Sequence, residues 1–241
     1  MMKKRVIKKF AQARLLILGC GDVGMRLLPL VRERFRVFAV TSQASRCDEL
    51  RAAGAVPMIA NLDQPATLAR LSRLASVIVH LAPPQQDGIH DQRTRNLVSI
   101  LPEHATLVYI STSGVYGDCG GALVNETRTV NPQNPRAKRR VDAEQILRAW
   151  ARRSGSRLVI LRVPGIYAVD RLPLERLQSQ TPVLQPEEDA YSNHIHSDDL
   201  ARLVCAAVYH GKPQRVINTC DGSETKMGDY FDEVADAFGL D

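Results

Sequence analysis

Short apolar runs alternate with segments of helical periodicity along the chain. The apolar runs lack the strict apolar–polar alternation of a half-exposed strand, so they are typical of strands buried on both faces of a parallel sheet. They predict strands at 14–20, 36–40, 55–60, 76–82, 106–111, 157–163 and 215–220. The segments between them predict helices at 22–34, 45–53, 65–74, 88–100, 136–153, 198–210 and 225–238. This alternation favours an α/β fold with a doubly wound parallel sheet.

Local signals refine this outline. Asp198 and Ser223 precede the last two predicted helices, and we expect them to cap the first turns of those helices. The stretch 164–195 carries four prolines and no clear period, so we expect loops that face a substrate there. We therefore expect a first domain over 1–163 and a small C-terminal region over 164–241 that is interleaved with the last strand of the sheet.

Composition and charge narrow the class of protein. The 241 residues are 44% hydrophobic and 24% charged, as in an ordinary globular domain. We expect a cytoplasmic protein, because no apolar run approaches the ~20 residues that cross a bilayer and no secretory core follows the basic start. The five cysteines form no C-x-x-C pair, which favours reduced thiols and no metal site. The net charge of +6 permits an anionic partner, but the aromatic content of 5% gives no reason to expect nucleic acid.

The stretch LLILGCGDVGMRLL carries a G-x-G-x-x-G pattern at Gly19, Gly21 and Gly24, between the first predicted strand and the first predicted helix. In that setting the pattern is typical of the dinucleotide-binding Rossmann fold. The first glycine permits a tight turn, the second lets the backbone approach a diphosphate, and the third lets the helix pack on the strand. The free N–H groups of the helix start, around Asp22 and Val23, would face the phosphates.

The end of the second predicted strand bears on the identity of the dinucleotide. NAD-binding proteins usually place Asp or Glu there, to bind the ribose 2′-hydroxyl. This chain has Thr41 and Ser42 instead, and Arg46 follows within reach of the same corner. Hydroxyl groups and a guanidinium suit the 2′-phosphate of NADP. We therefore expect NADP, with NAD as the alternative if Arg46 is an ordinary exposed helix residue.

Four segments together resemble one known superfamily: the glycine loop, VIVHLAPP at 77–84, YISTSGVYGD at 109–118 and NHIHSDDLA at 193–201. Over most of its length the chain is similar to the extended short-chain dehydrogenase/reductases, in particular the NAD-dependent epimerase/dehydratase group. The resemblance implies oxidoreductase, epimerase or dehydratase chemistry on a small substrate, either anionic or nucleotide-linked. It also implies further cofactor contacts at Asn61, Leu81, Ala82, Pro83, Pro164 and Gly165.

The segment NPQNPRAKRRVDAEQIL departs from that group. The usual pattern of the group is Pro, Tyr, three residues, Lys, three residues and Glu. This chain keeps the proline at 135 and the glutamate at 144, but it has Arg136 and Arg140 in place of the tyrosine and the lysine. The family's tyrosine transfers the carbinol proton. Arginine cannot do so, because its pKa is above ~12 and it has no acceptor lone pair. Among the family's catalytic positions, Thr112 remains able to polarise a carbonyl.

Several interpretations of these residues stay open. Arg136 and Arg140 share one helix face; facing the substrate they could hold a carboxylate or phosphate, with Arg140 also binding ribose hydroxyls. Alternatively, the basic residues of 136–140 form a solvated turn. Tyr116 and Tyr167 are candidate surrogate acids.

The histidines have a mainly structural interpretation. We expect His80 to be a core or cofactor-edge residue, and His196 with Asp199 to make structural hydrogen bonds rather than bind a metal. The resemblance leaves a homodimer open, through a four-helix bundle that would include the 88–100 and 136–153 helices. It also leads us to expect a C-terminal region that is small or shortened.

Three functional hypotheses follow, of which the third, a nucleic-acid binder, rests on the net charge alone. The first is a cytoplasmic NADP-binding enzyme with non-standard catalytic residues. The second is a dinucleotide-binding sensor or regulatory protein without turnover, which the missing tyrosine motivates.

Overall fold

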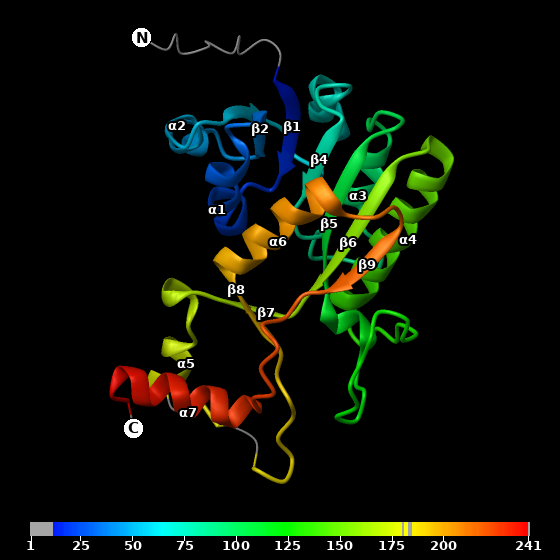
Figure 1. Ribbon diagram of the computed structural model, residues 1–241. Coiled ribbons are helices and arrows are strands. Elements are labelled where there is room, and N and C mark those ends of the chain that lie inside the picture. The colour runs from blue at the N-terminus through cyan, green and yellow to red at the C-terminus, as the bar shows by residue number, and fades with distance from the viewer. Residues whose placement is uncertain (1–11, 180, 183–184, 241) are drawn as a thin grey trace, which may run out of the picture.

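A parallel sheet forms the centre of the molecule. The computed structural model describes residues 12–179, 181–182 and 185–240, and the basic start of the chain lies outside them. The described residues form a seven-stranded parallel sheet in the order β3-β2-β1-β4-β5-β6-β9 and a separate parallel pair, β7-β8. The strands are β1 (Ala13–Leu18), β2 (Phe35–Thr41), β3 (Val56–Ile59), β4 (Val77–His80), β5 (Thr106–Thr112), β6 (Arg157–Val163), β7 (Gly165–Tyr167), β8 (His194–His196) and β9 (Arg215–Asn218). The expected doubly wound α/β fold is confirmed (Figure 1).

Helices connect the strands. They are α1 (Asp22–Val31), α2 (Cys47–Ala52), α3 (Gln92–Val98), α4 (Pro135–Ser154), α5 (Leu174–Gln178), α6 (Ser197–His210) and α7 (Met227–Phe238), with 3₁₀ turns η2 (Ala44–Arg46), η3 (Pro65–Leu71), η4 (Ser113–Tyr116) and η5 (Val169–Arg171). Each predicted strand and helix has a counterpart in the structure. The predicted helix at 65–74 is the 3₁₀ segment η3 rather than an α-helix.

Two apolar layers cover the faces of the sheet. Successive residues of a strand point to opposite faces, so Leu15 and Ile17 of β1 pack with α1, α2 and α6, while Leu16 and Leu18 pack with η3, α3 and α4. Figure 1 shows α1 and α6 in front of the sheet and α3 and α4 behind it. Strands covered on both faces have no solvated side, which explains their unbroken apolar sequences.

The chain leaves the main sheet after β6 and returns to it. It forms β7, η5, α5 and β8 before α6 packs on α1 and β9 joins the sheet edge beside β6. The last helix, α7, then lies against α5 away from the sheet (Figure 1). The guanidinium of Arg176 on α5 stands 4.7 Å from the ring centre of Phe231 on α7. The C-terminal region is therefore made of segments that alternate with parts of the main sheet.

Both predicted helix caps are wrong. The cap of α6 is His196, whose ring Nδ1 accepts from the amide of Asp198 at 3.2 Å. Asp198 is two residues beyond this cap, and its carboxylate pairs with Arg26. The residue before α7 is Lys226, three positions beyond Ser223, whose hydroxyl donates to Asp221 at 2.7 Å. A ring nitrogen thus caps α6 in place of Asp198, and no described side chain caps α7.

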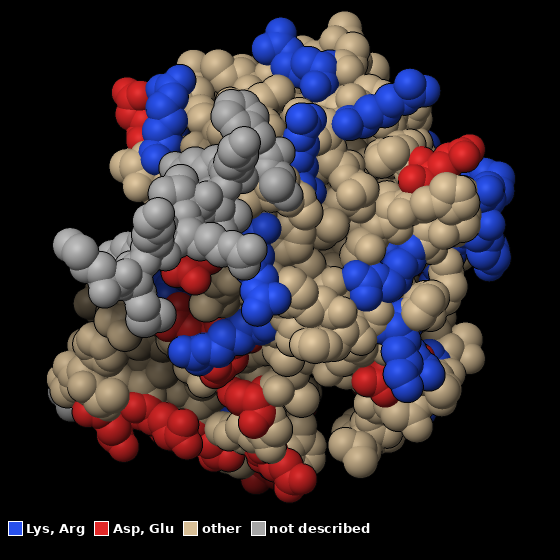
Figure 2. Space-filling view, turned by 45° about the horizontal axis from the view of Figure 1, so that its top comes forward, with Lys and Arg blue, Asp and Glu red and all other residues tan. Residues whose placement is uncertain are grey.

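Charged side chains are unevenly spread over the surface. Exposed acids gather on α7 at Asp229, Asp232, Glu233 and Asp236. Figure 2 shows acidic side chains along the lower edge of the molecule, whereas Lys and Arg side chains on that face stand in separate groups. Across the described ranges, no helix combines the length and the apolar character that crossing a bilayer requires.

Candidate dinucleotide-binding and active site

The strand order reverses between β1 and β4, and the carboxyl ends of these strands meet. Leu81 and Ala82 follow β4, and their amides donate to the carbonyl of Leu18 at 2.9 and 3.0 Å. In open parallel sheets, ligands bind outside the carboxyl ends of the strands where the order reverses. The glycine loop lies at this point, because β1 leads directly into it (Figure 1).

The three glycines of the loop have distinct surroundings. Gly19 has a φ of +80°, and a Cβ there would lie 2.6 Å from the backbone of Ala82. A Cβ on Gly24 would lie 2.9 Å from the sulfur of Cys20, so this glycine allows the start of α1 to pack closely. A Cβ on Gly21 would meet no protein atom within 4 Å, and it would project into open space above the loop. That space is where the backbone could approach a ligand.

The first turn of α1 offers backbone donors to this space. Gly21 is the N-cap, and no described side chain caps the turn that begins at Asp22 and includes Val23. The first N–H groups of a helix have no partner within the helix, and they carry a partial positive charge that favours phosphate. Open space beside Gly21 and uncapped amides together fit the diphosphate of a dinucleotide.

Arg46 lies at the edge of the same loop. Its NH1 donates to the carbonyl of Cys20 at 2.7 Å, and its Nε pairs with Glu49 at 2.9 Å. The hydroxyl of Thr41 accepts from the amide of Gln43 at 3.1 Å and so shapes the turn that follows β2. Ser42 is exposed. Arg46, expected near the end of the second strand, thus contacts the glycine loop and is already engaged with an acid on α2.

Sequence reasoning missed a link across the carboxyl edge of the sheet. Asn61 follows β3, and its side-chain oxygen accepts from the amide of Asp63 at 3.0 Å. Asp63 forms a bidentate pair with Arg93 of α3 at 2.7 Å, and Arg93 also donates to the carbonyl of Pro83 at 3.0 Å. This link fixes two predicted cofactor residues, Asn61 and Pro83, relative to each other. The Asp63–Arg93 spacing in sequence gave no signal for it.

Thr112 ends β5 and begins the η4 turn. Its hydroxyl oxygen accepts from the amide of Gly114 at 3.3 Å, which leaves the hydroxyl hydrogen free to donate. The side chain is half-buried. Thr112 therefore keeps the donor that polarising a substrate carbonyl requires.

Arg136 and Arg140 occupy different environments on α4. Arg136 is exposed in the first turn. Arg140 is only 5% exposed, and its NH1 donates to the carbonyl of Ile110 at 2.7 Å and to the hydroxyl of Tyr109 at 3.0 Å. The neighbouring Arg139 is also buried and donates to the carbonyl of Gly88. The solvated basic turn is therefore wrong for Arg139 and Arg140, because both guanidiniums satisfy backbone carbonyls in the interior.

A buried polar network lies beside Arg140. His80, Thr94 and Tyr109 are each at most 1% exposed, and the hydroxyl of Thr94 lies 3.3 Å from Nε2 of His80 and donates to Asp91 at 2.8 Å. Burial lowers the pKa of His80 to about 3, and nearby Arg140 acts in the same direction. Burial also raises the pKa of Tyr109 to about 12. His80 is a core residue because it is buried, and neither ring changes charge near neutral pH.

A second buried network lies at the end of β6. Glu144 of α4 forms a bidentate pair with Arg162, at 2.7 and 3.1 Å, and accepts from Ser111 at 2.6 Å. Tyr116 is buried, with the guanidinium of Arg162 at 4.7 Å from its ring centre, and its hydroxyl donates to Asn218 at 2.7 Å. These contacts give Tyr116 a structural environment rather than that of an acid facing a substrate.

Tyr167 belongs to an aromatic group in the C-terminal region. Its ring lies 5.3 Å from His196 and 6.3 Å from His194, which stacks on Tyr230 at 4.2 Å. Burial and the carboxylate of Asp221 raise the pKa of Tyr167. Its phenol therefore stays protonated at neutral pH, where it can donate a proton or hydrogen bond but cannot act as a base.

Pro164 and Gly165 connect β6 to this aromatic group. The amide of Gly165 donates to the carbonyl of Asn193 at 3.2 Å, and a Cβ on Gly165 would lie 2.8 Å from the ring of His194. The structure thus places both residues directly after the carboxyl end of β6. Asp199 pairs with Arg202 at 2.5 Å. No group of three or more potential metal ligands occurs among the described residues.

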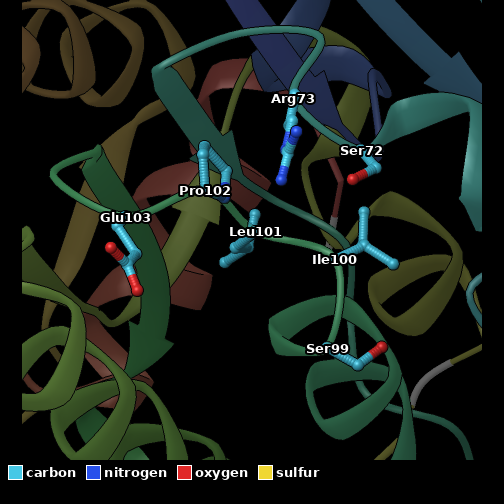
Figure 3. A pocket seen from close by; sticks show the side chains of 7 residues that line it. All are labelled: Ser72, Arg73, Ser99, Ile100, Leu101, Pro102 and Glu103. Carbon is cyan, nitrogen blue, oxygen red and sulfur yellow. The ribbon is translucent and has the colours of Figure 1, made fainter.

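A surface depression lies away from this edge. A depression of about 560 Å³ is lined by residues that precede β4 and β5, at the amino edge of the sheet: Ser72, Arg73, Ser99, Ile100, Leu101, Pro102 and Glu103. Figure 3 shows these side chains on the loops around it. Its residues come from the opposite end of the strands, so it is not part of the dinucleotide site.

The comparisons with known proteins agree with this geometry. The family described as "NAD dependent epimerase/dehydratase family" matches residues 15–220. The chain belongs to this family. Its cofactor is therefore a nicotinamide dinucleotide. This agrees with the interpretation of the glycine loop as a dinucleotide-binding loop.

Relatives of this epimerase/dehydratase family protein are distant. A GDP-6-deoxy-D-mannose reductase of Pseudomonas aeruginosa is 25% identical over 211 residues, 75% of this chain and 69% of the relative. The dTDP-glucose 4,6-dehydratase DesIV of Streptomyces venezuelae, a double mutant with NAD bound, has a TM-score of 0.79 at 19% identity, covering 95% of this chain and 82% of that one. A Thermus thermophilus UDP-glucose 4-epimerase with NAD has a TM-score of 0.77 at 20% identity, covering 95% and 84%. At these identities, the two solved structures establish the fold alone.

Proposed function

We propose that this family member is an NADP-preferring reductase, epimerase or dehydratase whose small substrate is nucleotide-linked or otherwise anionic. The observation that carries the proposal is Arg46, held at 2.7 Å from the carbonyl of Cys20 in the glycine loop. A bound nicotinamide ring would supply a hydride donor or acceptor. Binding, orientation and proton transfer would fall to the residues of this chain.

The preference for NADP depends on charge at one corner. The end of β2 carries Thr41 and Ser42 and no acid, so the usual acceptor for a ribose 2′-hydroxyl is missing there. Arg46 supplies a guanidinium, which forms strong charge-assisted hydrogen bonds with phosphate. Glu49 already pairs with Arg46, and a 2′-phosphate must compete with this exposed carboxylate. Exposed ion pairs contribute little free energy, so a 2′-phosphate can displace Glu49 from Arg46 at little cost.

Replacing Arg46 tests this preference. Arg46→Ala should weaken NADP⁺ binding about tenfold or more while changing NAD⁺ binding little, because only NADP⁺ loses a charge-assisted hydrogen bond. Isothermal titration calorimetry measures both affinities. Arg51→Ala is a matched control, since Arg51 also pairs with an acid three residues away, Asp48, but is more exposed. Equal losses for the two cofactors would contradict a 2′-phosphate contact.

Several residues would share the catalytic roles that the tyrosine and lysine have in the family. Thr112 would polarise the substrate carbonyl with its free hydroxyl hydrogen. Arg140 would act as a positioning residue, because it anchors Ile110 two residues before Thr112. Arg136, exposed in the first turn of the same helix, would bind an anionic group of the substrate. Tyr167 is the candidate hydrogen-bond or proton donor.

Steady-state kinetics test the role of Arg136. Nucleotide-linked sugars of the GDP, dTDP and UDP types are the first substrates to try, since the relatives above carry those names. Arg136→Gln should raise KM about tenfold with little change in kcat, because it removes a charged contact present in ground and transition states alike. Lys138→Gln is the control on the same exposed turn. An unchanged KM in Arg136→Gln would remove this residue from the site.

A sensor without turnover is the second candidate. It is favoured by one observation: the position of the family's base holds an arginine, which cannot accept a proton. Cofactor binding without NADPH consumption across the substrate panel would support it. A change of oligomeric state on cofactor addition, measured by sedimentation, would add a regulatory readout. A homodimer through α3 and α4 stays a proposal to be tested in the same measurement.

A further inference from the structure

A cluster of ion pairs joins the glycine loop to the C-terminal region. Arg26 of α1 pairs with Asp22 at 2.8 Å, with Asp198 of α6 at 2.6 Å and with Asp170 of η5 at 3.7 Å. Arg171, next to Asp170, pairs with the second oxygen of Asp22 at 3.2 Å. The η5 turn after β7 therefore contacts the start of α1 through two ion pairs, Arg171 with Asp22 and Asp170 with Arg26.

Asp22 places a negative charge in the first turn of α1. It lies between Gly21 and Gly24, within the turn whose amides fit a diphosphate. A carboxylate at that place attracts the cations around it and repels a phosphate that arrives. A dinucleotide can therefore bind well only if the charge of Asp22 is compensated, or if one of its cations turns to the phosphate.

The two arginines beside Asp22 differ in their freedom. Arg26 is shared by three carboxylates, and hydrogen bonds to Asp198 and Asp22 raise its pKa. Arg171 is 40% exposed, and Asp22 is the carboxylate within ion-pair distance of it in the described part of the chain. Arg26 is thus committed to its acids, whereas Arg171 can exchange its partner at little cost.

We propose that Arg171 is a ligand of the cofactor diphosphate, held beside the glycine loop by Asp22 until the diphosphate takes it over. A guanidinium binds phosphate oxygens through two parallel hydrogen bonds, which a half-exposed carboxylate at 3.2 Å does not match. The proposal rests on cofactor binding at the glycine loop, as set out above. It adds a contact from the C-terminal region to a site otherwise built from the main sheet.

The move of Arg171 from Asp22 to the diphosphate would also couple cofactor binding to the position of the segment after β7. Arg171 is the last residue of η5, in the segment that leads from Gly165 and Tyr167 of β7 to α5. When Arg171 turns from Asp22 to the diphosphate, this segment is tied to the cofactor itself. Binding of the cofactor would therefore fix the region that is expected to cover the substrate.

Calorimetry with two probes tests the proposal. NADP⁺ contains the diphosphate, whereas adenosine 2′-monophosphate contains the adenine and the 2′-phosphate without it. Arg171→Gln should weaken NADP⁺ binding about tenfold and leave adenosine 2′-monophosphate binding unchanged, since a charged hydrogen bond is lost only with the first probe. Arg202→Gln is the control, because Arg202 pairs with Asp199 at 2.5 Å and is 67% exposed.

Asp22→Asn provides a second, opposite readout. It removes the repulsion and releases Arg171, so NADP⁺ should bind more tightly than to the wild type, and Arg171→Gln in that background should abolish the gain. Thermal melting of each variant confirms that it is folded. If Arg171→Gln binds NADP⁺ as the wild type does, or weakens both probes equally, the role of Arg171 is overturned while the proposed function stands. If the wild type binds neither NADP⁺ nor NAD⁺, the proposed function fails and this inference fails with it.

Discussion

Gly19 and Gly21 lie two residues apart, yet a methyl group would meet different surroundings at each. At Gly19 it would collide with the backbone of Ala82, and the φ of +80° is one that residues with a Cβ rarely adopt. At Gly21 the φ is −83° and no protein atom lies within 4 Å of the added carbon. The fold therefore requires a glycine at position 19, whereas at position 21 it leaves open space beside the loop, where we propose that the cofactor binds.

This difference predicts opposite effects of two alanine substitutions. Gly19→Ala should lower the free energy of unfolding by about 1–2 kcal/mol or more, through strain and the clash with Ala82. Gly21→Ala should leave the melting temperature unchanged but weaken NADP⁺ binding, because its methyl group fills the space beside the loop. Thermal melts and calorimetry on the two variants separate the effects. A destabilised Gly21→Ala protein with normal affinity would contradict this assignment.

At the residue scale, the sequence predicts positions better than contacts. The spacing of glycines places the loop, whereas the hydrogen bond from Arg46 to the carbonyl of Cys20 in that loop was not among the expectations. The target of Arg140 could not be predicted, because the choice between the substrate side and the carbonyl of Ile110 depends on side-chain rotamers and on how α4 packs over β5. The link from Asp63 to Arg93 joins residues thirty positions apart, and no local pattern encodes it.

At the scale of elements, α4 is fastened to the sheet by buried charge as well as by apolar packing. Glu144 and Arg162 are each about 5% exposed, and Ser111 of β5 donates to the same carboxylate. The carboxylate is paired on both oxygens, so its burial is compensated. Removing one partner would leave a charge in the interior without an opposite charge.

Glu144→Gln should therefore lower the free energy of unfolding by about 3–5 kcal/mol, since Arg162 would remain charged and buried. Urea unfolding measures the change. Glu233→Gln, on the exposed face of α7, should change it by less than about 0.5 kcal/mol. Arg162→Met should cost less in the Glu144→Gln protein than in the wild type, because the two residues act as a unit. Additive losses would show that the pair does not.

The sequence predicts which strands and helices are present better than it predicts the residues at which they begin and end. Each predicted strand and helix is present because period and apolar content decide them over many residues. The ends depend on single hydrogen bonds, such as that from the amide of Asp198 to His196, and imidazole was not among the expected caps. The 3₁₀ form of η3 is likewise a local choice that periodicity does not resolve.

At the scale of the whole molecule, the buried imidazole of His80 links stability to pH. Burial lowers its pKa to about 3, while an unfolded chain has an ordinary histidine. Between about pH 6.5 and 3 the unfolded chain therefore binds a proton at this residue that the folded chain does not. Acidification in that window favours unfolding, and stability rises again with pH.

Lowering the pH from 6.5 to 5 should thus reduce the free energy of unfolding by about 2 kcal/mol through His80, at roughly 1.4 kcal/mol per pH unit. Urea unfolding of the wild type and of His80→Asn over this range measures the contribution as a difference in slope. The substitution is expected to lower stability at pH 7 but to make the pH dependence shallower. Parallel curves would mean that His80 is protonated alike in both states.

The sequence correctly predicts the sheet, the helices on its two faces and the family, because these depend on patterns that extend along the chain. It does not predict how the C-terminal region contacts the glycine loop. The pairs of Arg26 with Asp198 and of Arg171 with Asp22 span 172 and 149 positions. Such contacts depend on how segments far apart in the chain come together, which only the assembled molecule shows.

The return of the chain to the sheet has a practical consequence for protein engineering. The backbone passes between the sheet and the outlying segments after β6, again between β8 and α6, and a third time after β9. One proteolytic nick cannot release the outlying part as a single fragment. A chimaera that exchanges it with another member of the family must therefore graft two separate stretches, 164–196 and 219–240, and keep α6 and β9 from the host.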